Sequence, residues 1–359
     1  MTSNPQVLYD TVLRAQAALH QNPTIEQIFR EDAHLVITPS NNCDANCLHC
    51  VSNATSNGQI MSFRQFDTIP PEFLKLFPYI DFGRKGDPIT YQDDKKDLAD
   101  IIEKIEQQHP KEFSIAIALH ESEPVAVAKL AKLTTTIKTM ITYHHYFQDL
   151  DTKALARKFN TTLHHAAKYS DAILISLAGD DFSLKQPTMA QEVTAVFEEN
   201  KSLIFKGFEI SQETHNPYTY SLQIENQFKN KKIELKIPPI DTRIYSLGRF
   251  RQYLKDQGTL VQYEKEFAKK MGEYTCPDMI TWPGIILEPN GDLNLCGSYE
   301  AINCKNAVVT NIFKKPYQQV QQDLLNLRKR ELAWFVQNID DIMNGKVPMC
   351  KLENKCYTI

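Results

Sequence analysis

Short apolar runs alternate with amphipathic stretches along the first two thirds of the chain. Apolar, often β-branched runs predict strands at 34–38, 79–82, 114–119, 139–143, 172–176, 205–210 and 233–237. Between several of these runs, apolar residues recur at helical spacing, which predicts helices over 98–105, 125–133, 155–167 and 189–197. Strands that alternate with helices predict an α/β fold with a mostly parallel sheet and outer helices. About six or seven strands in some 210 residues fit a partial (β/α)6 TIM-like barrel better than a closed eightfold one.

The two ends of the chain show a different pattern. Residues 1–33 carry two short apolar stripes at helical spacing and predict an N-terminal helical segment. Beyond residue 250, helices are predicted near 250–270 and 317–337, with short strands at 282–287 and 292–296 between them. These strands flank Pro289-Asn290-Gly291, which is typical of a hairpin turn. We therefore expect three parts, which are a helical segment 1–33, a barrel 34–250 and a C-terminal domain 251–359.

Composition and charge narrow the class of protein. The 359 residues are 42% hydrophobic and 23% charged, as in soluble globular proteins, and the net charge of −4 gives no sign of a nucleic-acid or anionic-membrane partner. The sequence has no apolar run of membrane-spanning length and does not begin like a signal peptide, so a cytoplasmic protein is expected. In a reducing compartment, eight cysteines indicate metal or redox chemistry rather than disulfides.

Three of the cysteines lie close together in the loop predicted after the first strand. Cys43, Cys47 and Cys50 have the spacing C-x3-C-x2-C, and the next cysteine is Cys276. A closed zinc site or a fully ligated iron–sulfur cluster needs four protein ligands. Three thiolates on a cubane therefore leave one iron open to a small molecule. Half of a zinc site and ordinary buried thiols are the alternatives.

This spacing resembles the motif of radical S-adenosylmethionine (SAM) enzymes. The resemblance implies a [4Fe–4S] cluster held by Cys43, Cys47 and Cys50, with the amino and carboxylate groups of SAM on its open iron. Reductive cleavage of SAM would then give methionine and a 5′-deoxyadenosyl radical, which abstracts a substrate hydrogen. His49 stands where the family usually has an aromatic ring on the adenine side, and a solvated loop histidine is the alternative.

Two further segments are similar to SAM-contacting segments of that superfamily. Gly86-Asp87-Pro88 follows the second predicted strand and resembles Gly-Gly-Glu-Pro, whose backbone and carboxylate hold the amino group of SAM. Here Lys85 replaces the first glycine and Asp87 the glutamate, and an ordinary turn is the alternative. Ser176 ends a later strand in a stretch similar to Ser-Leu-Asp-Gly, where the serine lies near the ribose or carboxylate of SAM. A turn serine is equally consistent with the sequence.

Polar residues at other predicted strand ends are candidates for the cavity mouth, because active sites of parallel barrels lie at the C-terminal ends of the strands. Glu121 is a candidate for the ribose hydroxyls of SAM. His144, His145 and Glu209 are candidates for substrate contacts. Each of these residues has the alternative of being a surface or satisfied core polar group.

The C-terminal cysteines have a second recognisable spacing. Cys276, Gly291 and Cys296 follow the form C-x(9–15)-G-x4-C, which is similar to the opening of auxiliary-cluster domains called SPASM or, in shorter form, Twitch. The resemblance implies one auxiliary [4Fe–4S] cluster on Cys276, Cys296, Cys350 and Cys356, with Cys304 as an alternate ligand. A four-cysteine zinc site is the alternative.

The function that these resemblances imply is a radical SAM enzyme. Its substrate is expected to be a small molecule (an amino acid, sugar or natural-product intermediate), because the roughly 33 residues before the first strand are too few for a leader-peptide module. The outcome would be oxidation, crosslinking, epimerisation or rearrangement, with a flavodoxin or ferredoxin as electron donor. The alternatives are a peptide- or protein-modifying maturase and a non-enzymatic iron–sulfur or zinc protein.

Overall fold

A computed structural model of the chain describes the segments that build its sheet and most of the helices around it. The described residues are 24–28, 33–43, 50, 54–83, 85–108, 112–117, 124–145, 151–179, 197–212, 219–223, 232–236, 252, 255–262, 284–294 and 308–343. No helix in this part of the chain combines the length and the apolar character needed to cross a lipid bilayer.

Eleven strands of the described residues form one sheet, in the order β13-β12-β11-β1-β2-β5-β6-β7-β10-β9-β8. Their bounds are β1 His34–Ile37, β2 Tyr79–Phe82, β5 Glu112–Ile117, β6 Thr136–His145, β7 Ala172–Gly179, β8 Glu209–Gln212, β9 Thr219–Gln223, β10 Lys232–Lys236, β11 Gly284–Leu287, β12 Asp292–Asn294 and β13 Val308–Asn311. A separate two-stranded hairpin consists of β3 (Gln92–Asp93) and β4 (Lys96–Asp97).

The centre of the sheet is parallel. Each neighbouring pair from β11 through β1, β2, β5, β6 and β7 to β10 is parallel, and only the outer strands β12, β13, β9 and β8 join antiparallel neighbours. The sheet curves, but the described residues include no pairing between its end strands β13 and β8, so no closed barrel is formed by them. The prediction of an α/β fold with a mostly parallel sheet is confirmed.

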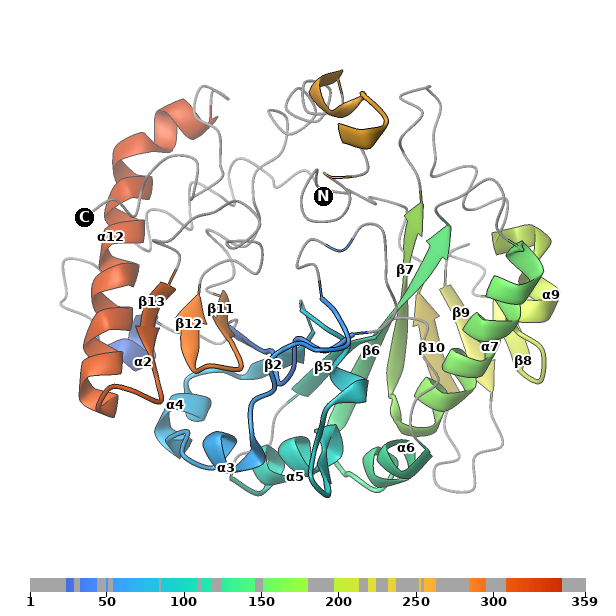
Figure 1. Cartoon of the computed structure of the whole chain (residues 1–359), viewed down its shortest axis with the longest axis horizontal. Coiled ribbons are helices and arrows are strands. Elements are labelled where there is room, and N and C mark those ends of the chain that lie inside the picture. Colours follow the sequence, from blue (N-terminus) through green and yellow to red (C-terminus); the bar gives the residue numbers. More distant parts are fainter. Residues whose placement is uncertain are drawn as a thin grey trace.

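Helices follow the outer side of the curved sheet (Figure 1). Along the chain they are α2 Ile25–Ile28, α3 Phe63–Phe66, α4 Pro71–Lys75, the 3-10 helix η1 Pro88–Thr90, α5 Leu98–Gln108, α6 Pro124–Leu130, α7 Thr152–Tyr169, α9 Lys201–Ile204 and α12 Tyr317–Met343. α12 packs against β13 and α2, while α5, α6 and α7 contact one another in sequence order.

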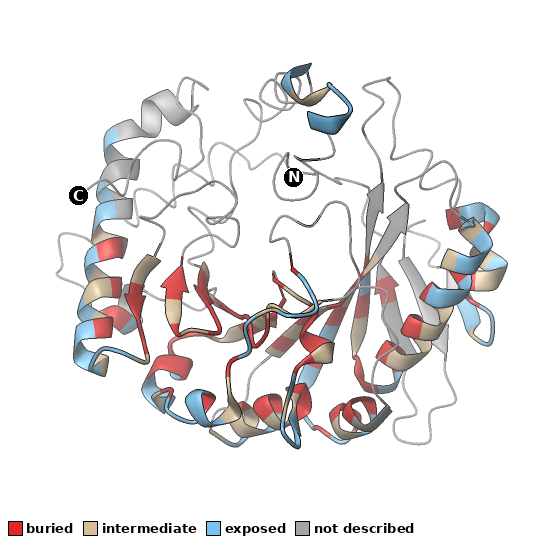
Figure 2. Cartoon of the chain, viewed as in Figure 1, coloured by how far each residue is buried: buried red, intermediate tan, exposed pale blue. Residues whose placement is uncertain are grey.

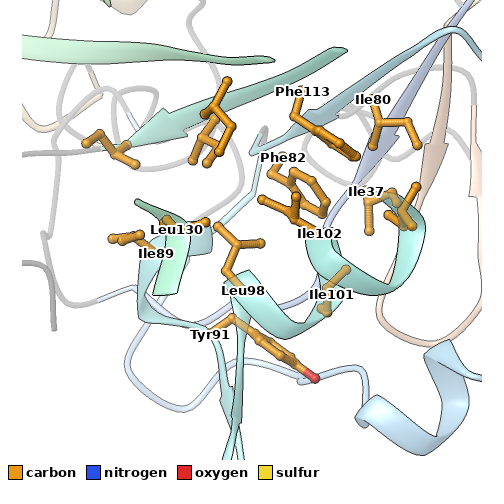
Figure 3. Packing of buried hydrophobic residues seen from close by; sticks show 14 of the residues in the cluster. Ile37, Ile80, Phe82, Ile89, Tyr91, Leu98, Ile101, Ile102, Phe113 and Leu130 are labelled. Atoms are coloured by element: carbon orange, nitrogen blue, oxygen red, sulfur yellow. The ribbon is translucent and has the colours of Figure 1, made fainter. Parts of the chain in front are cut away.

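The core lies between the sheet and these helices, as the buried residues in Figure 2 show. In β5, Phe113, Ile115 and Ile117 are buried while the alternate residues are half-buried, as expected when only one face of a strand is covered by helices. Phe113 and Phe82 stack at 6.2 Å between ring centroids and meet Ile102 of α5 (Figure 3). This packing fixes the strands whose C-terminal ends carry the site.

One predicted strand is wrong in its first half. Phe205 and the two residues after it form a turn at the end of α9, and the strand begins only at Glu209. Gly207 has the left-handed φ of +88°, and the ring of Phe208 stacks on His164 of α7 at 4.1 Å between centroids. The apolar run there therefore packs on a helix rather than extending the sheet.

Several elements were not predicted, and several predictions lie outside the described residues. No prediction was made for α3, α4, η1, α9, β3, β4, β9 or β13. Helices were predicted at 1–33, 189–197 and 250–270, and most residues of these ranges lie outside the part of the chain that the structure describes. The predicted hairpin around Pro289-Asn290-Gly291 is confirmed by the antiparallel pairing of β11 and β12. This hairpin extends the same sheet, because β11 pairs with β1 in parallel.

Candidate metal and cofactor site

Three neighbouring strands end at one edge of the sheet. β11, β1 and β2 are parallel neighbours, with Leu35 opposite both Ile285 and Ile80. The segments that follow them, which are 288–291, 38–43 and 83–88, therefore meet at the edge where active sites of parallel α/β proteins lie. The segment 38–43, which we call the cysteine loop, is the middle one.

The cysteine loop is held by both neighbours at its start. The amide of Thr38 donates to the carbonyl of Leu287 at 2.9 Å, on the β11 side. The hydroxyl of Thr38, which is buried, donates to the carbonyl of Gly83 at 3.3 Å, on the β2 side. The loop therefore leaves the sheet in a fixed direction.

Further along, the loop runs beside residues 55–61. The amide of Cys43 donates to the carbonyl of Thr55 at 2.9 Å, the amide of Asn41 to Gln59 at 2.8 Å, and the amide of Met61 to Pro39 at 2.8 Å. Within the loop, the amide of Asn42 donates to the hydroxyl of Ser40 at 2.9 Å. These bonds fix the backbone up to the first motif cysteine.

Two of the three motif cysteines, Cys43 and Cys50, are described, and both are half-buried. Cys43 ends the cysteine loop. Cys50 lies a few residues before the segment 55–61, which is hydrogen-bonded to this loop. The amide of Ala54 donates to Sγ of Cys50 at 3.3 Å. Hydrogen bonds of this kind orient and tune thiolates that bind metals. The donor chemistry therefore fits an iron–sulfur cluster.

Two glycines permit the chain to pass close to this loop from different segments. Gly86 has φ of +66°, and a Cβ there would lie 2.4 Å from the carbonyl oxygen of Ser40 and 2.7 Å from that of Asn42. A Cβ on Gly58 would lie 2.3 Å from the carbonyl carbon of Asn41. The amide of Asp87 donates to the carbonyl of Asn42 at 3.2 Å. The Gly86-Asp87 segment and the cysteine loop are thus in direct backbone contact, which only glycine at 86 allows.

The carboxylate of Asp87 has a structural contact. It is 1% exposed, and its Oδ1 accepts from the amide of Ile89 at 3.1 Å, so it caps the 3-10 helix η1 that begins at Pro88. Its charge also acts on Tyr169, whose pKa is raised chiefly by complete burial and further by Asp87. The predicted contact of this carboxylate with the amino group of SAM stays a prediction.

Lys85, which directly precedes the Gly86-Asp87 segment, forms a buried ion pair. Its Nζ lies 2.8 Å from Oε1 of Glu288, and the two side chains are 2% and 4% exposed. Glu288 also accepts from Nδ2 of Asn294 at 3.2 Å and opens the turn between β11 and β12. The ion pair therefore joins the first and third of the three converging segments.

The cysteine loop also carries buried acceptors. Oδ1 of Asn41 and Oδ1 of Asn42 are inaccessible to solvent, and neither accepts a hydrogen bond from the described residues. Buried amide oxygens are normally hydrogen-bonded.

The other predicted site residues that the structure describes differ in their positions along the strands. His144 and His145 are the last two residues of β6, and His145 pairs with Gly179 at the end of the neighbouring strand β7. The prediction that Ser176 ends its strand is wrong, because β7 continues to Gly179, and Ser176 pairs with Thr142 inside the strand. The predicted position of Glu209 at the C-terminal end of a strand is wrong, because this residue begins β8, and its substrate role stays a prediction.

The other predicted ligands and contacts lie outside the described residues. They are Cys47, His49, Glu121, Cys276, Cys296, Cys304, Cys350 and Cys356. Among the residues that are described, no three His, Cys, Asp or Glu side chains form a group that could hold a metal ion.

Sequence reasoning missed the part of Lys85 and Glu288 in this site. The departure of Lys85 from the superfamily pattern was one signal, and an acidic residue directly after the apolar run Gly284–Leu287 was another. Neither signal reveals that the two charges meet, because the residues are far apart in the sequence.

No family model matches the chain, and no curated protein is similar enough to count as a match.

Proposed function

We propose that this chain is a radical SAM enzyme in which the cysteine loop holds a [4Fe–4S] cluster. The observation that carries the proposal is the backbone contact between the Gly86-Asp87 segment and the loop that leads to Cys43. A C-x3-C-x2-C motif directly after a parallel strand, touching a glycine segment that follows the neighbouring strand, is an arrangement suited to a cluster and its ligand. The finer fold assignment, a partial (β/α)6 barrel, is part of this proposal.

The residues of the chain have distinct parts in this function. Cys43, Cys47 and Cys50 would bind three irons, and the Ala54 amide would orient the Cys50 thiolate. The backbone around Gly86 and Asp87 would bind the amino group of SAM, while Glu121, Ser176 and His49 are the candidates for its ribose, carboxylate and adenine. When bound, the cluster supplies the electron that cleaves SAM reductively and so starts hydrogen abstraction.

The substrate and the C-terminal cluster belong to the same proposal. A small molecule at the strand ends near His144 and His145 would be the substrate, and a flavodoxin or ferredoxin the electron donor. Cys276, Cys296, Cys350 and Cys356 would hold an auxiliary cluster, to which the β11–β12 hairpin leads.

Metal analysis of anaerobically reconstituted protein tests the proposal. Iron and zinc are measured in the parent, in a Cys43→Ala/Cys47→Ala/Cys50→Ala variant, and in Cys304→Ala, which tests whether this alternate auxiliary ligand is needed. We expect about eight irons in the parent and Cys304→Ala, and about four in the triple variant. The same samples are tested for dithionite-dependent formation of 5′-deoxyadenosine from SAM.

Each other result has a definite meaning. About four irons and one zinc in the parent, with the iron lost in the triple variant, would keep the radical chemistry but make the C-terminal site a structural zinc site. Zinc without iron, or iron that the triple variant retains in full, would overturn the proposal.

A further inference from the structure

The Lys85–Glu288 ion pair links two segments that are far apart in the sequence. Lys85 directly precedes the Gly86-Asp87 segment, and Glu288 follows β11 at the start of the turn to β12. Both side chains are more than nine-tenths buried, at 2% and 4% exposure. Two buried charges carry a desolvation penalty, so removing one partner alone is expected to be strongly destabilising.

The pair lies close to the contacts that shape the cysteine loop. On the Lys85 side, Asp87 donates its amide to Asn42, and Gly86 packs against Ser40. On the Glu288 side, the preceding residue Leu287 accepts from the amide of Thr38. The pair therefore spans the cysteine loop and ties together the two segments that flank it.

The hairpin side is itself held rigidly. The amide of Glu288 donates to Asp292 at 2.9 Å, and Asn294 of β12 donates its side-chain amide to the Glu288 carboxylate. Any displacement of β12 would therefore be transmitted to the carboxylate that faces Lys85. Cys296, a proposed auxiliary ligand, follows Asn294 by two residues.

We propose that Lys85 and Glu288 are positioning residues through which the C-terminal hairpin sets the conformation of the Gly86-Asp87 segment and hence the affinity for SAM. The coupling between hairpin and segment stands on the contacts above, whereas its effect on SAM rests on the proposed function. Lys85 thus replaces the flexibility of a glycine with a fixed connection to the hairpin.

Three variants separate positioning from plain charge burial. Glu288→Gln removes the Glu288 charge that faces the buried Lys85 ammonium, whereas Lys85→Met/Glu288→Gln removes both charges and keeps similar side-chain shapes. Leu163→Ala, in the buried face of α7, lowers stability without touching either segment and serves as the control. Thermal midpoints are measured for all of them.

The first readout needs no cofactor. Hydrogen exchange is followed by mass spectrometry in peptides that cover 38–43, 85–90 and 284–294. We expect Glu288→Gln to raise exchange in the first two segments more than Leu163→Ala does at an equal loss of thermal midpoint. In the double variant, the thermal midpoint returns toward the parent, but exchange at 85–90 stays raised.

The second readout is the dissociation constant of SAM on reconstituted protein, measured by equilibrium dialysis. We expect the double variant to bind SAM about tenfold more weakly than the parent at equal iron content, as for other residues that orient a metal site from outside it. Return of both exchange and SAM affinity in the double variant would overturn the proposal.

The two readouts distinguish a failure of the proposed function from a failure of the proposed coupling. A parent that binds neither iron nor SAM would refute the proposed function, while the exchange data would still decide the coupling. If the double variant fails to fold, the comparison of Glu288→Gln with Leu163→Ala decides it, and equal exchange in the cysteine loop of these two would refute the coupling.

Discussion

Gly86 and Gly258 have nearly the same left-handed backbone, with φ of +66° and +69°, but different surroundings. A Cβ on Gly258 would meet no atom within 4 Å, whereas a Cβ on Gly86 would meet backbone atoms of the cysteine loop. The backbone cannot rotate away as a flexible side chain can. A comparison of Ala substitutions at Gly86 and Gly258 therefore separates the strain of a left-handed backbone from the steric clash with the cysteine loop.

We predict that Gly86→Ala destabilises the protein by about 1–3 kcal/mol more than Gly258→Ala does. Both variants pay the left-handed penalty of a residue with a Cβ, about 1–2 kcal/mol, and only the first also displaces Ser40 and Asn42. Urea denaturation gives the two free energies of unfolding. Equal losses would show that the cysteine loop yields freely at this contact.

Asp100 is a carboxylate whose ion pairs predict a pH-dependent contribution to stability. Burial alone would raise its pKa, but hydrogen bonds from Lys129 and Lys96, at 2.7 and 2.9 Å, outweigh this effect and hold the pKa well below its usual range. The side chain is 12% exposed, so solvent screens these contacts only in part. A carboxylate with a lowered pKa stabilises the fold above its unfolded pKa of about 4.

We predict that this contribution, about 2 kcal/mol, is lost as the pH falls below about 4. Asp100→Asn would therefore lose less stability than the parent between pH 7 and pH 3, measured as the free energy of unfolding in urea. Asp94→Asn, at the exposed turn of the β3–β4 hairpin, is the control for removing a carboxylate outside these ion pairs. Parallel curves for the parent and Asp100→Asn would contradict this prediction.

At the scale of elements, the sequence predicts those helices and strands whose formation depends on the local spacing of apolar residues. The alternation in β5 and the apolar stripe of α5, with Leu98, Ile101, Ile102 and Ile105 buried, follow directly from periodicity. Phe205 and Phe208 misled the prediction, because an apolar run beside Gly207 reads as a strand until its packing on α7 is known. The order of strands in the sheet cannot be predicted from hydrophobic periodicity either, because the residues of Gly284–Leu287 do not indicate that β1 is the neighbouring strand.

The candidate site divides in the same way. The cysteine spacing and the variant glycine segment are local patterns and could be found in the sequence. The contact of Asp87 with Asn42 and the pairing of Lys85 with Glu288 depend on tertiary structure, so they could not.

The β11–β12 hairpin offers a test at element scale. Gly291 has φ of +86°, and a Cβ there would lie 2.2 Å from the ring of Phe313. We predict that Gly291→Ala displaces this ring and destabilises the protein by about 1–3 kcal/mol beyond the left-handed penalty. Gly207→Ala is the control, with φ of +88° and 3.2 Å to the edge of the His164 ring. Thermal denaturation of both variants measures the difference, and an equal loss would contradict the predicted clash.

At the scale of the molecule, one sheet joins segments that the sequence assigned to separate parts. β11, β12 and β13 belong to the predicted C-terminal domain, yet β11 forms a full parallel ladder with β1 of the predicted barrel. The buried ion pair Lys85–Glu288 adds a second connection at the same boundary. Elements that share a sheet and a core unfold together more readily than elements joined by a linker.

We therefore predict a single cooperative transition for the described core. Differential scanning calorimetry should give one peak, and residues 34–37 and 284–287 should become exposed to hydrogen exchange at the same denaturant concentration. Two resolved transitions, with 284–287 opening first, would show instead that the C-terminal part unfolds as an independent unit.

The position of β1 also affects the order in which the chain can fold as it is synthesised. One neighbour of this strand, β2, follows within some 50 residues, but the other, β11, is made roughly 250 residues later. At about 5–20 residues per second, the ribosome needs more than ten seconds to deliver it. During that time, the edge of the strand that leads into the cysteine loop remains without its second partner. Chaperone binding to nascent chains would be expected to concentrate on this edge until Leu287 has emerged.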